Sequence, residues 1–422
     1  MAPLRRGPSG GTVATAAIRL FHHLGAAFDC LAAALDRDRV LAYCRILIVA
    51  ETVGLLFLVA GTHGLIVPLA RPTSTDFVSF YAAGVLANAG TPELVYDQSA
   101  HHAAEERATA TGVEYRFFYY PPVFLLVCAA FARLPYLAAF LAFEGVTLAL
   151  FLVVMRQILD RRGWSALIPV LAFPALYWTL GLGQNSFLTA ALFAAGTLWI
   201  ERRPILAGIC FGALCYKPHF GLLVPVALLA GRHWRAFAAA LLAGAALCAL
   251  SLALFGWETW AGFLRAAFGA HTTYESGRII FGGFVSPFGA VLLVGGAAGA
   301  AYAAQAAAKL AAAIFVALVW RRGCVLPIRA AALTAATLVA IPVVLIYDLM
   351  LAAVAAAWLS DDYEAPPPWE KAALAALLVL CVDPRGLAEL SGIPIAPLVA
   401  IGMVAIIAAR TFGATARRTT AA

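Results

Sequence analysis

The stretch ALLAGAALCALSLALF, Ala240 to Phe255, contains no charged residue. It also lacks the alternation of apolar and polar residues that a membrane β-strand of about ten residues shows. An apolar run of about 20 residues is long enough to cross a bilayer as a helix, and a helix satisfies its own backbone hydrogen bonds there. The stretch therefore predicts a transmembrane helix.

Apolar runs of this kind recur along the chain. Of the 422 residues, 63% are hydrophobic and 12% are charged, whereas a soluble domain carries about 25% charged residues. We therefore expect an all-α, polytopic integral membrane protein of about ten to thirteen transmembrane helices. Residues 1–422 are expected to form a single transmembrane domain.

The net charge of +7 comes from short basic tracts beside the apolar runs, among them DRDR, IERRP, GRHWR and VWRRG. Lys and Arg next to membrane spans mark the cytoplasmic side, whereas nucleic-acid binding requires one contiguous basic face. We therefore expect the lipid bilayer and no nucleic acid as a partner. Residues 1–39 are interpreted as a cytoplasmic or interfacial lead.

With that lead inside, the first apolar run takes the chain to the opposite side of the membrane. Residues 70–120 are the most polar stretch and form the first outer loop, where amphipathic helices are expected. Residues 256–284 form a second outer loop. Between residues 120 and 160, the charges allow two crossings against the positive-inside rule or one re-entrant segment, and the pattern does not choose between them.

An acidic residue stands near the start of the first outer loop. In RPTSTDFVSFYAAG, Arg71 to Gly84, Asp76 precedes aromatic residues at helical spacing. Asp is a common helix N-cap, worth about 1 kcal/mol, but the Glu or Gln that would complete a capping box is absent. A helix cap and a reactive carboxylate are equally good interpretations of Asp76.

Three further polar motifs interrupt apolar runs: Gln184 and Asn185 in GLGQNS, Lys217 in YKPH, and Tyr347 with Asp348 in IPVVLIYDLMLA. An ionisable residue at membrane depth is costly unless it is paired, so it is a functional hypothesis. The alternatives are that Lys217 extends to a lipid headgroup and that the amides are ordinary hairpin residues. All these residues can lie with Asp76 near the non-cytoplasmic face, which favours one site.

The chain resembles a known family through motifs that occur in the order TDFVSFYAAGVLANAGTPELVYD, FFYYPPVFLL, GLGQNSFLTAALFAAGTLWIERRPILAG, YKPHFGLLVPVALLAGRHWRA and IPVVLIYDLMLA. Over residues 45–360 it is similar to the GT-C membrane glycosyltransferases of glycosyltransferase family 87, which include polyprenol-phosphate-mannose-dependent mannosyltransferases. The resemblance implies transfer of a hexose, mannose above all, from polyprenyl phosphate to a lipid or glycan hydroxyl. It places the reaction on the periplasmic or extracellular side of a bacterial inner membrane.

The resemblance also implies roles for individual residues. Asp76 is the expected general base that takes the acceptor proton. The phosphate leaving group requires positive charge, and the residues expected to supply it are Lys217, His219, Arg265 and Arg278. The residues expected to bind the sugar or the acceptor are Tyr81, Tyr119, Gln184, Asn185, Tyr347 and Asp348.

A single carboxylate at the site predicts one displacement and therefore inversion at the anomeric carbon. The two outer loops contain no Asp-x-Asp pair and the chain has no Gly-rich phosphate loop, so a metal-bound nucleotide sugar is unsupported. We expect no metal site and no cofactor besides the polyprenyl-phosphate sugar, which is a substrate.

Two other classes of function share part of this pattern. A secondary transporter of a polar or anionic solute also has broken helices and charges at membrane depth, but internal repeats are absent and the charges gather toward one face. A non-catalytic assembly protein is the third interpretation. Replacing Asp76 by Asn separates an enzyme from an assembly protein, because only the enzyme would lose its function.

Overall fold

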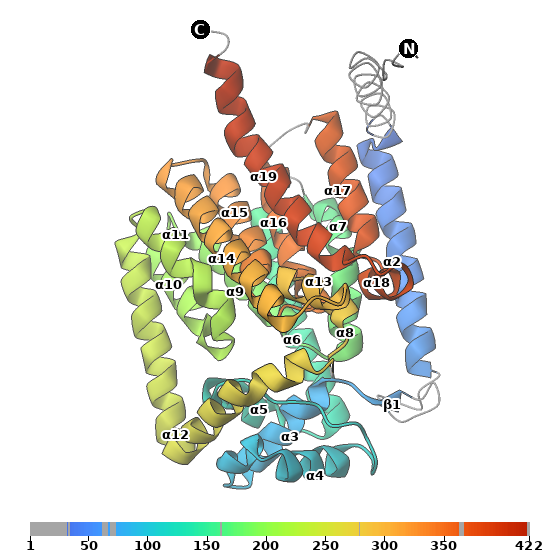
Figure 1. The fold of residues 1–422 in the computed structure, drawn as a ribbon, viewed down its shortest axis with the longest axis vertical. Helices are drawn as coiled ribbons and strands as arrows, with labels where there is room; N and C mark the ends of the chain where they lie inside the picture. Colours follow the sequence, from blue (N-terminus) through green and yellow to red (C-terminus); the bar gives the residue numbers. More distant parts are fainter. Residues whose placement is uncertain are drawn as a thin grey trace, which may run out of the picture.

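The computed structural model describes residues 32, 34–60, 66–67, 73–160, 163–277, 279–362 and 367–419. Helices make up nearly all the regular structure (Figure 1). The strands in the described part are β1 (Ile66–Val67) and β2 (Thr73–Ser74), which pair antiparallel just before the helix that begins at Phe77. The expected all-α fold class is confirmed.

Among the described residues, five helices are long and apolar enough to cross a membrane. They are α2 (Arg37–Ala60), α6 (Tyr136–Ile158), α12 (Trp234–Glu275), α14 (Ala298–Arg321) and α19 (Ile395–Thr419). A sixth span results if η3 (Trp164–Leu167) with α7 (Ile168–Leu171) and α8 (Pro174–Leu182), bent by 62°, cross together. The protein is therefore a multi-pass membrane protein.

The remaining helices of the bundle are shorter, and most begin with a proline in the first turn, where its missing N–H costs nothing. They are α9 (Ser186–Trp199), α10 (Pro204–Ala213), η4 (Leu214–Tyr216), η5 (Pro218–Leu223), α11 (Val224–Ala230), η6 (Phe281–Gly283), α13 (Pro287–Leu293), α15 (Leu326–Ala340), η7 (Ile346–Leu349), α16 (Met350–Asp362), α17 (Pro368–Leu380) and α18 (Pro384–Ser391). Because the chain is interrupted so often, helix length alone identifies fewer spans than the ten to thirteen expected.

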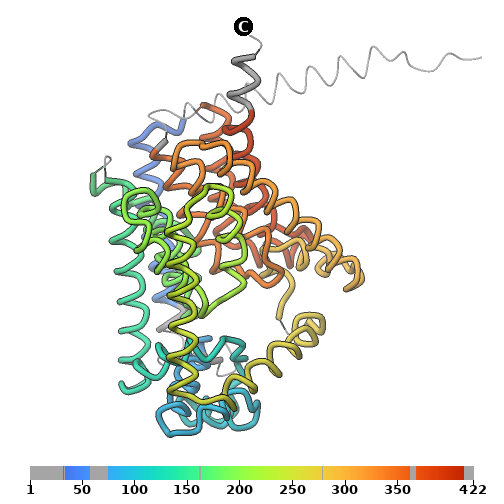
Figure 2. The backbone as a smooth tube through the Cα atoms, turned by 90° about the vertical axis from the view of Figure 1, so that its left-hand side faces the viewer, coloured from blue at the N-terminus to red at the C-terminus, as the bar shows by residue number. Residues whose placement is uncertain are grey.

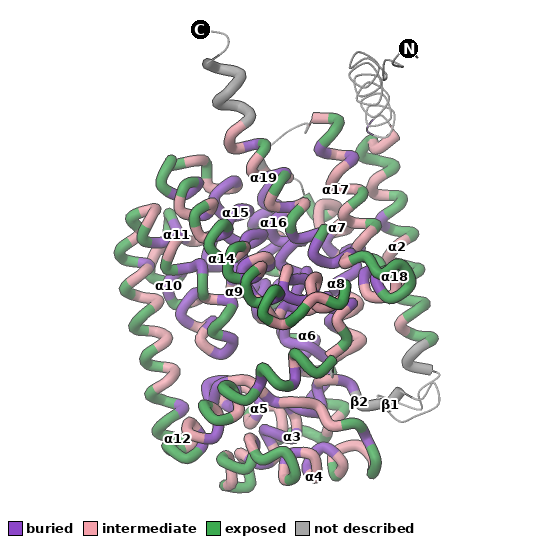
Figure 3. Tube along the Cα trace, in the orientation of Figure 1, coloured by how far each residue is buried: buried purple, intermediate pink, exposed green. Residues whose placement is uncertain are grey.

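Helices α9, α15 and α16 form the buried centre of the bundle, whereas α2 and the first part of α12 lie at its edge (Figure 3). The edge helices expose large apolar side chains, such as Ile46 at 66%, Phe57 at 74% and Leu242 at 71%. Extended apolar surface of this kind requires a non-aqueous partner. Along these helices that partner is the lipid.

An outer layer covers one end of the bundle, opposite the end where α2 begins (Figures 1 and 2). It consists of α3 (Phe77–Asn88), η1 (Pro92–Tyr96), α4 (Gln98–Ala108) and α5 (Pro122–Phe131). Aromatic rings hold it together: Phe80 lies 5.1 Å from Phe124 and Phe77 lies 5.6 Å from Phe143 of α6, between ring centroids. Since α3 is buried on most sides, it is a core element of this layer rather than a surface helix.

The packing of this layer shows how many times residues 120–160 cross the membrane. Helix α5 has only ten residues and packs against α3 and α12, so it does not cross the membrane. Helix α6, with 23 residues, then makes the one crossing in this region. Helix α12 bends at Gly256, which has a φ of 76°, and its second half lies along the outer layer (Figure 2).

The basic tracts lie at the opposite end. Arg329 of α15 donates hydrogen bonds to Glu201, beside α10, and to His233 Nε2, at 3.2 Å and just before α12. Its guanidinium also lies over the ring of Trp320, at the end of α14. The turns that carry IERRP, GRHWR and VWRRG therefore meet around one arginine, and α12 runs from this end to the outer layer.

Candidate functional site

The site forms where α8 ends against the start of α3. Gly183 follows α8 in the left-handed conformation, with a φ of +68°. A Cβ at this position would lie 2.6 Å from the Cβ of Phe77, so only glycine fits without strain. The carbonyl of Leu182 accepts a hydrogen bond of 2.7 Å from the backbone N–H of Asp76. The turn is thereby held directly against Asp76.

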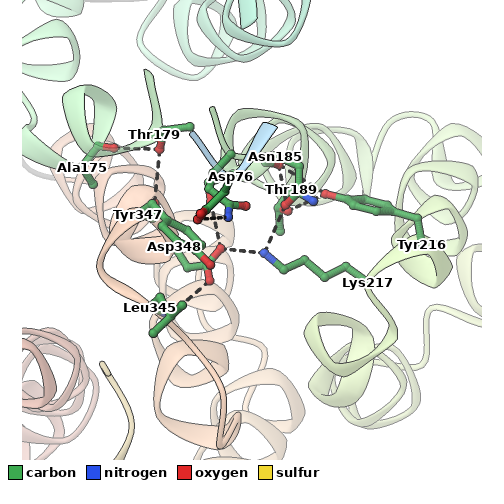
Figure 4. Close-up of polar contacts among 12 residues, drawn as sticks. Asp76, Ala175, Thr179, Asn185, Thr189, Tyr216, Lys217, Leu345, Tyr347 and Asp348 are labelled. Carbon is green, nitrogen blue, oxygen red and sulfur yellow. Dashed lines mark hydrogen bonds and ion pairs between the residues drawn. The ribbon is translucent and has the colours of Figure 1, made fainter. Parts of the chain in front are cut away.

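The three polar residues that follow Gly183 each hold a charged side chain from a different part of the sequence (Figure 4). This one tripeptide therefore gathers the start of α3, the break before η5 and the start of η7 into one cluster. Gln184 Nε2 donates to Asp76 Oδ2 at 2.8 Å, Asn185 Oδ1 accepts from Lys217 Nζ at 3.2 Å, and Ser186 Oγ donates to Asp348 Oδ1 at 2.8 Å.

Lys217 and Asp348 form a buried ion pair. Lys217 Nζ lies 2.8 Å from Asp348 Oδ1, and the side chains are 5% and 3% exposed. The backbone N–H of Leu345 donates to Asp348 Oδ2 at 3.3 Å, and Lys217 Nζ also lies over the rings of Phe220 and Tyr347, at 4.5 and 5.7 Å. Both charges are therefore compensated inside the protein, as burial requires.

Asp76 differs, because its side chain does not cap the helix that it precedes. It makes no cap hydrogen bond to α3; Oδ2 is bound by Gln184, and Oδ1 lies 3.6 Å from Arg116 Nε. One quarter of the side chain is exposed. The helix-cap interpretation of Asp76 therefore does not fit the contacts of this carboxylate.

Arg116 is a site residue that the sequence reasoning missed. It lies in the segment between α4 and α5, and its guanidinium also approaches Glu114 Oε2, at 3.5 Å from Nη2. A signal was present in EYRFFYYPP, where one basic residue directly precedes the aromatic entry to the membrane. Without the fold, nothing distinguished it from the other charged residues of the outer loop.

The three tyrosines expected at the site have different environments. Tyr347 is buried beside Lys217, as Figure 4 shows. The hydroxyl of Tyr119 lies 2.8 Å from Thr273 Oγ1 and so joins the segment before α5 to the second half of α12. The hydroxyl of Tyr81 donates to the carbonyl of Leu134 at 3.0 Å, so it is engaged between α3 and the turn before α6, and the structure does not bring it into the cluster.

The other expected cations are not among the contacts of this cluster. His219 is exposed two residues after Lys217, with its ring 5.0 Å from that of Phe220. Arg265 is exposed on the second half of α12. Arg278 lies outside the described residues. Within the described cluster, positive charge comes from Lys217 and Arg116.

The site retains an unused hydrogen-bond acceptor. Gln184 is 5% exposed, and its Oε1 has no hydrogen-bond partner, although its Nε2 is bound to Asp76. A buried acceptor without a partner is costly, and a hydroxyl group placed beside Asp76 would satisfy it. No cluster of three or more His, Cys, Asp or Glu that could hold a metal occurs within the described part of the chain.

Comparison with known families adds one match. The model of the family described as glycosyltransferase family 87 matches residues 118–347, which is more than half of the 422-residue chain. The matched range contains Gln184, Asn185 and Lys217, whereas Asp76 lies before it and Asp348 directly after it. No curated protein and no solved structure matches the chain.

Proposed function

This chain belongs to glycosyltransferase family 87, and from that premise we propose how its site transfers a sugar. The protein is a membrane glycosyltransferase. We infer that its donor is a hexose on polyprenyl phosphate, with mannose as the first candidate. The acceptor is a hydroxyl of a lipid or a glycan, and the enzyme works in a bacterial inner membrane.

The contacts of Asp76 carry this proposal. A carboxylate that is partly exposed, and that is held by Gln184 and Arg116 instead of by its own helix, is available to a substrate. We propose that it acts as the general base. The acceptor O–H proton moves to Asp76 while the acceptor oxygen bonds to the anomeric carbon, and the sugar–phosphate C–O bond breaks to release polyprenyl phosphate.

The released phosphate gains negative charge during this step, so nearby positive charge lowers the barrier. Lys217 is the proposed source, with Arg265, Arg278 and His219 as further candidates. Because Lys217 is already paired with Asp348, it can serve a phosphate only by sharing its protons between the two anions. Asp348, Asn185, Tyr347 and Tyr119 remain proposed contacts for the sugar or the acceptor.

One displacement by a single base inverts the anomeric centre, so we propose that a β-linked donor sugar gives an α-glycoside. The NMR coupling constants of the purified product test this. A product with retained configuration would require a covalent intermediate and a second reactive carboxylate.

We further propose that the site faces the periplasm. The basic turns joined by Arg329 lie at the end of the bundle opposite the outer layer. Basic residues beside spans stay in the cytoplasm, which orients the outer layer and Asp76 to the other side. Labelling of single cysteines in whole cells, introduced at exposed Glu93 and at Arg322, would test this orientation.

The decisive experiment is a transfer assay with purified protein in lipid, radiolabelled polyprenyl-phosphate mannose and a membrane-lipid extract as acceptor. Asp76→Asn is expected to lower transfer by at least about 100-fold, since it removes a general base. The matched control is Asp97→Asn, at a carboxylate that caps α4 by accepting from the Ala100 N–H at 2.9 Å.

The control variant is expected to transfer at the wild-type rate. Equal transfer by wild type and Asp76→Asn would show that Asp76 is not the general base. If the wild type transfers mannose to no acceptor fraction, other polyprenyl-phosphate hexoses are tested next, and failure with all of them contradicts the proposed donor class.

A further inference from the structure

We propose that Arg116 is a positioning residue for the Asp76 base, and that the buried Glu105 of α4 keeps Arg116 in place. The inference rests on the proposed function, because it takes Asp76 as the base. It goes further by assigning roles to Arg116 and Glu105, two residues of the first outer loop that do not contact Lys217.

The guanidinium of Arg116 lies between two carboxylates. Nε is 3.6 Å from Asp76 Oδ1, which is too long for a hydrogen bond but close enough for a strong attraction. Nη2 is 3.5 Å from Glu114 Oε2, on a side chain that is 70% exposed and therefore well screened. Gln184 thus binds Asp76 Oδ2 by a hydrogen bond, and Arg116 attracts Oδ1 from 3.6 Å.

Two side chains hold the backbone on either side of the Arg116 side chain. Glu105 Oε2 accepts a hydrogen bond of 3.1 Å from the Arg116 N–H, and Ser79 Oγ donates to the carbonyl of Phe117 at 3.3 Å. This segment has no helix or strand bonds of its own. Since Ser79 N–H donates to the carbonyl of Asp76, the segment is anchored within one turn of the base.

His101 packs behind Glu105, without a hydrogen bond between the two side chains. Both side chains are fully buried, and His101 Nδ1 lies 3.7 Å from Glu105 Oε1. On its other side, His101 Nε2 contacts the carbonyl of Ser79 at 3.1 Å. The contacts therefore form a closed ring that leads from Asp76 through Arg116, Glu105 and His101 back to α3.

At neutral pH, Arg116 is the group in this ring that faces Asp76 with a positive charge. Burial raises the pKa of Glu105 to about 8, partly opposed by Arg116 and supported by Asp76, and burial lowers the pKa of His101 to about 4. Both groups are therefore neutral at pH 7 despite their approach, and Arg116 is left as the counter-charge of Asp76. The other titratable groups that sense Glu105 are Tyr115 and Tyr136, which are neutral at this pH.

The arrangement predicts that misplacing Arg116 slows the chemical step more than it weakens substrate binding. A shift of about 1 Å in a reacting group can cost roughly 100-fold in rate. The carboxylate would keep its hydrogen bond to Gln184 but would rotate about it without Arg116.

The first experiment compares Arg116→Gln and Arg116→Lys with the matched control Arg107→Gln, at an exposed arginine near the end of α4. Arg116→Gln is expected to lower kcat by about tenfold or more while KM changes by less than about threefold. Arg116→Lys should restore part of kcat, because it returns the charge without the planar fork. The control should match wild type.

Wild-type kcat in Arg116→Gln would overturn the positioning role. Equal losses of kcat in the Gln and Lys variants, accompanied by equal losses of melting temperature, would overturn it as well, since they would show a purely structural residue.

The second experiment tests Glu105 through pH, with Glu93→Gln as the control because Glu93 is exposed. Above pH 8, Glu105 becomes a third carboxylate beside Arg116, after Asp76 and Glu114, so wild-type kcat relative to pH 7 should fall. Glu105→Gln cannot ionise but can still accept from the Arg116 N–H, so its profile should lose this alkaline fall. An unchanged alkaline fall in Glu105→Gln would overturn the role of Glu105.

Thermal melting gives a readout that does not depend on transfer. The pKa of Glu105 is raised from 4.5 to about 8 on folding, so its contribution to stability is present below pH 4.5 and is lost as the pH rises toward 8. The melting temperature of wild type relative to Glu105→Gln should therefore fall across this window. If it does so while no sugar is transferred, the proposed function fails and the buried arrangement stands; if it stays constant, Glu105 does not titrate as proposed.

Discussion

Two charged clusters meet at residues 184–186, and they use their charges differently. In the inner cluster, Lys217 and Asp348 are 5% and 3% exposed and bind each other at 2.8 Å. In the outer cluster, Asp76 and Arg116 are 25% and 30% exposed and approach only to 3.6 Å. The inner pair is closed, whereas the outer pair is open to a substrate.

The difference indicates a division of roles. A buried pair at membrane depth is satisfied by its partners and holds separated segments together. A partly exposed carboxylate with one amide donor and one nearby cation is oriented, and it remains accessible to a substrate. We therefore assign chemistry to Asp76 first, and we regard the inner pair first as the support on which the Gln184 turn rests.

The sharpest way to break this comparison is to remove one inner charge. Lys217→Met leaves Asp348 buried without a counter-charge, which is expected to cost about 3–5 kcal/mol of unfolding free energy. The double variant Lys217→Met/Asp348→Leu should recover much of that loss. Thermal melting in detergent measures both, with Lys309→Met on the exposed face of α14 as the control.

The same variants separate support from catalysis. If the double variant regains transfer together with stability, Lys217 acts only through Asp348. If it regains stability but stays inactive, Lys217 or Asp348 has a direct role with the substrate. A Lys217→Met protein that melts like wild type would contradict the buried pair itself.

A smaller loss is expected from changing the turn that joins the clusters. Gly183→Ala places a Cβ against Phe77 in a left-handed conformation, which costs about 1–3 kcal/mol. Gly181→Ala is the matched control, because its Cβ would meet only Leu55, at an ordinary 3.6 Å. Equal melting temperatures for the two variants would show that the turn is free to move.

Gln184→Met sharpens the comparison from the outer side. It removes the amide that orients Asp76, so transfer should fall about tenfold, as for the loss of one hydrogen bond of about 1.4 kcal/mol. Stability should change little, because the Met side chain fills the same space. Gln157→Met, at an exposed amide near the end of α6, should leave transfer unchanged. Normal transfer in Gln184→Met would mean that Arg116 alone orients the base.

The smallest effect compares the two acids that precede outer-layer helices. Asp97→Ala removes the cap of α4 and should cost about 1 kcal/mol, whereas Asp76→Ala removes no cap hydrogen bond but leaves the buried Gln184 amide without its acceptor, which should cost at least as much. Chemical unfolding of the two variants, read from the aromatic fluorescence, measures the difference. A smaller loss for Asp76→Ala would show that the Gln184 amide finds another partner once Asp76 is removed.

The convergence of Gln184, Asn185, Lys217 and Asp348 was predictable from sequence, because a polar group within an apolar run must find a partner in the protein. Arg116 and Glu105 were not, because a charged residue in a polar loop has water as an alternative partner. Tyr81 was expected at the site from the resemblance to the family. The direction in which its hydroxyl points depends on packing, and it binds Leu134 instead.

The sequence by itself determined that the chain is helical and crosses a membrane several times, since long uncharged apolar runs have no other stable state in lipid. It also indicated which polar residues had to be explained. Only the tertiary structure decided that α5 does not cross, that Asp76 is not a helix cap, and that one tripeptide connects Asp76, Lys217 and Asp348. These outcomes depend on contacts between residues 32 to more than 100 positions apart, and no local pattern of apolar and polar residues specifies such contacts.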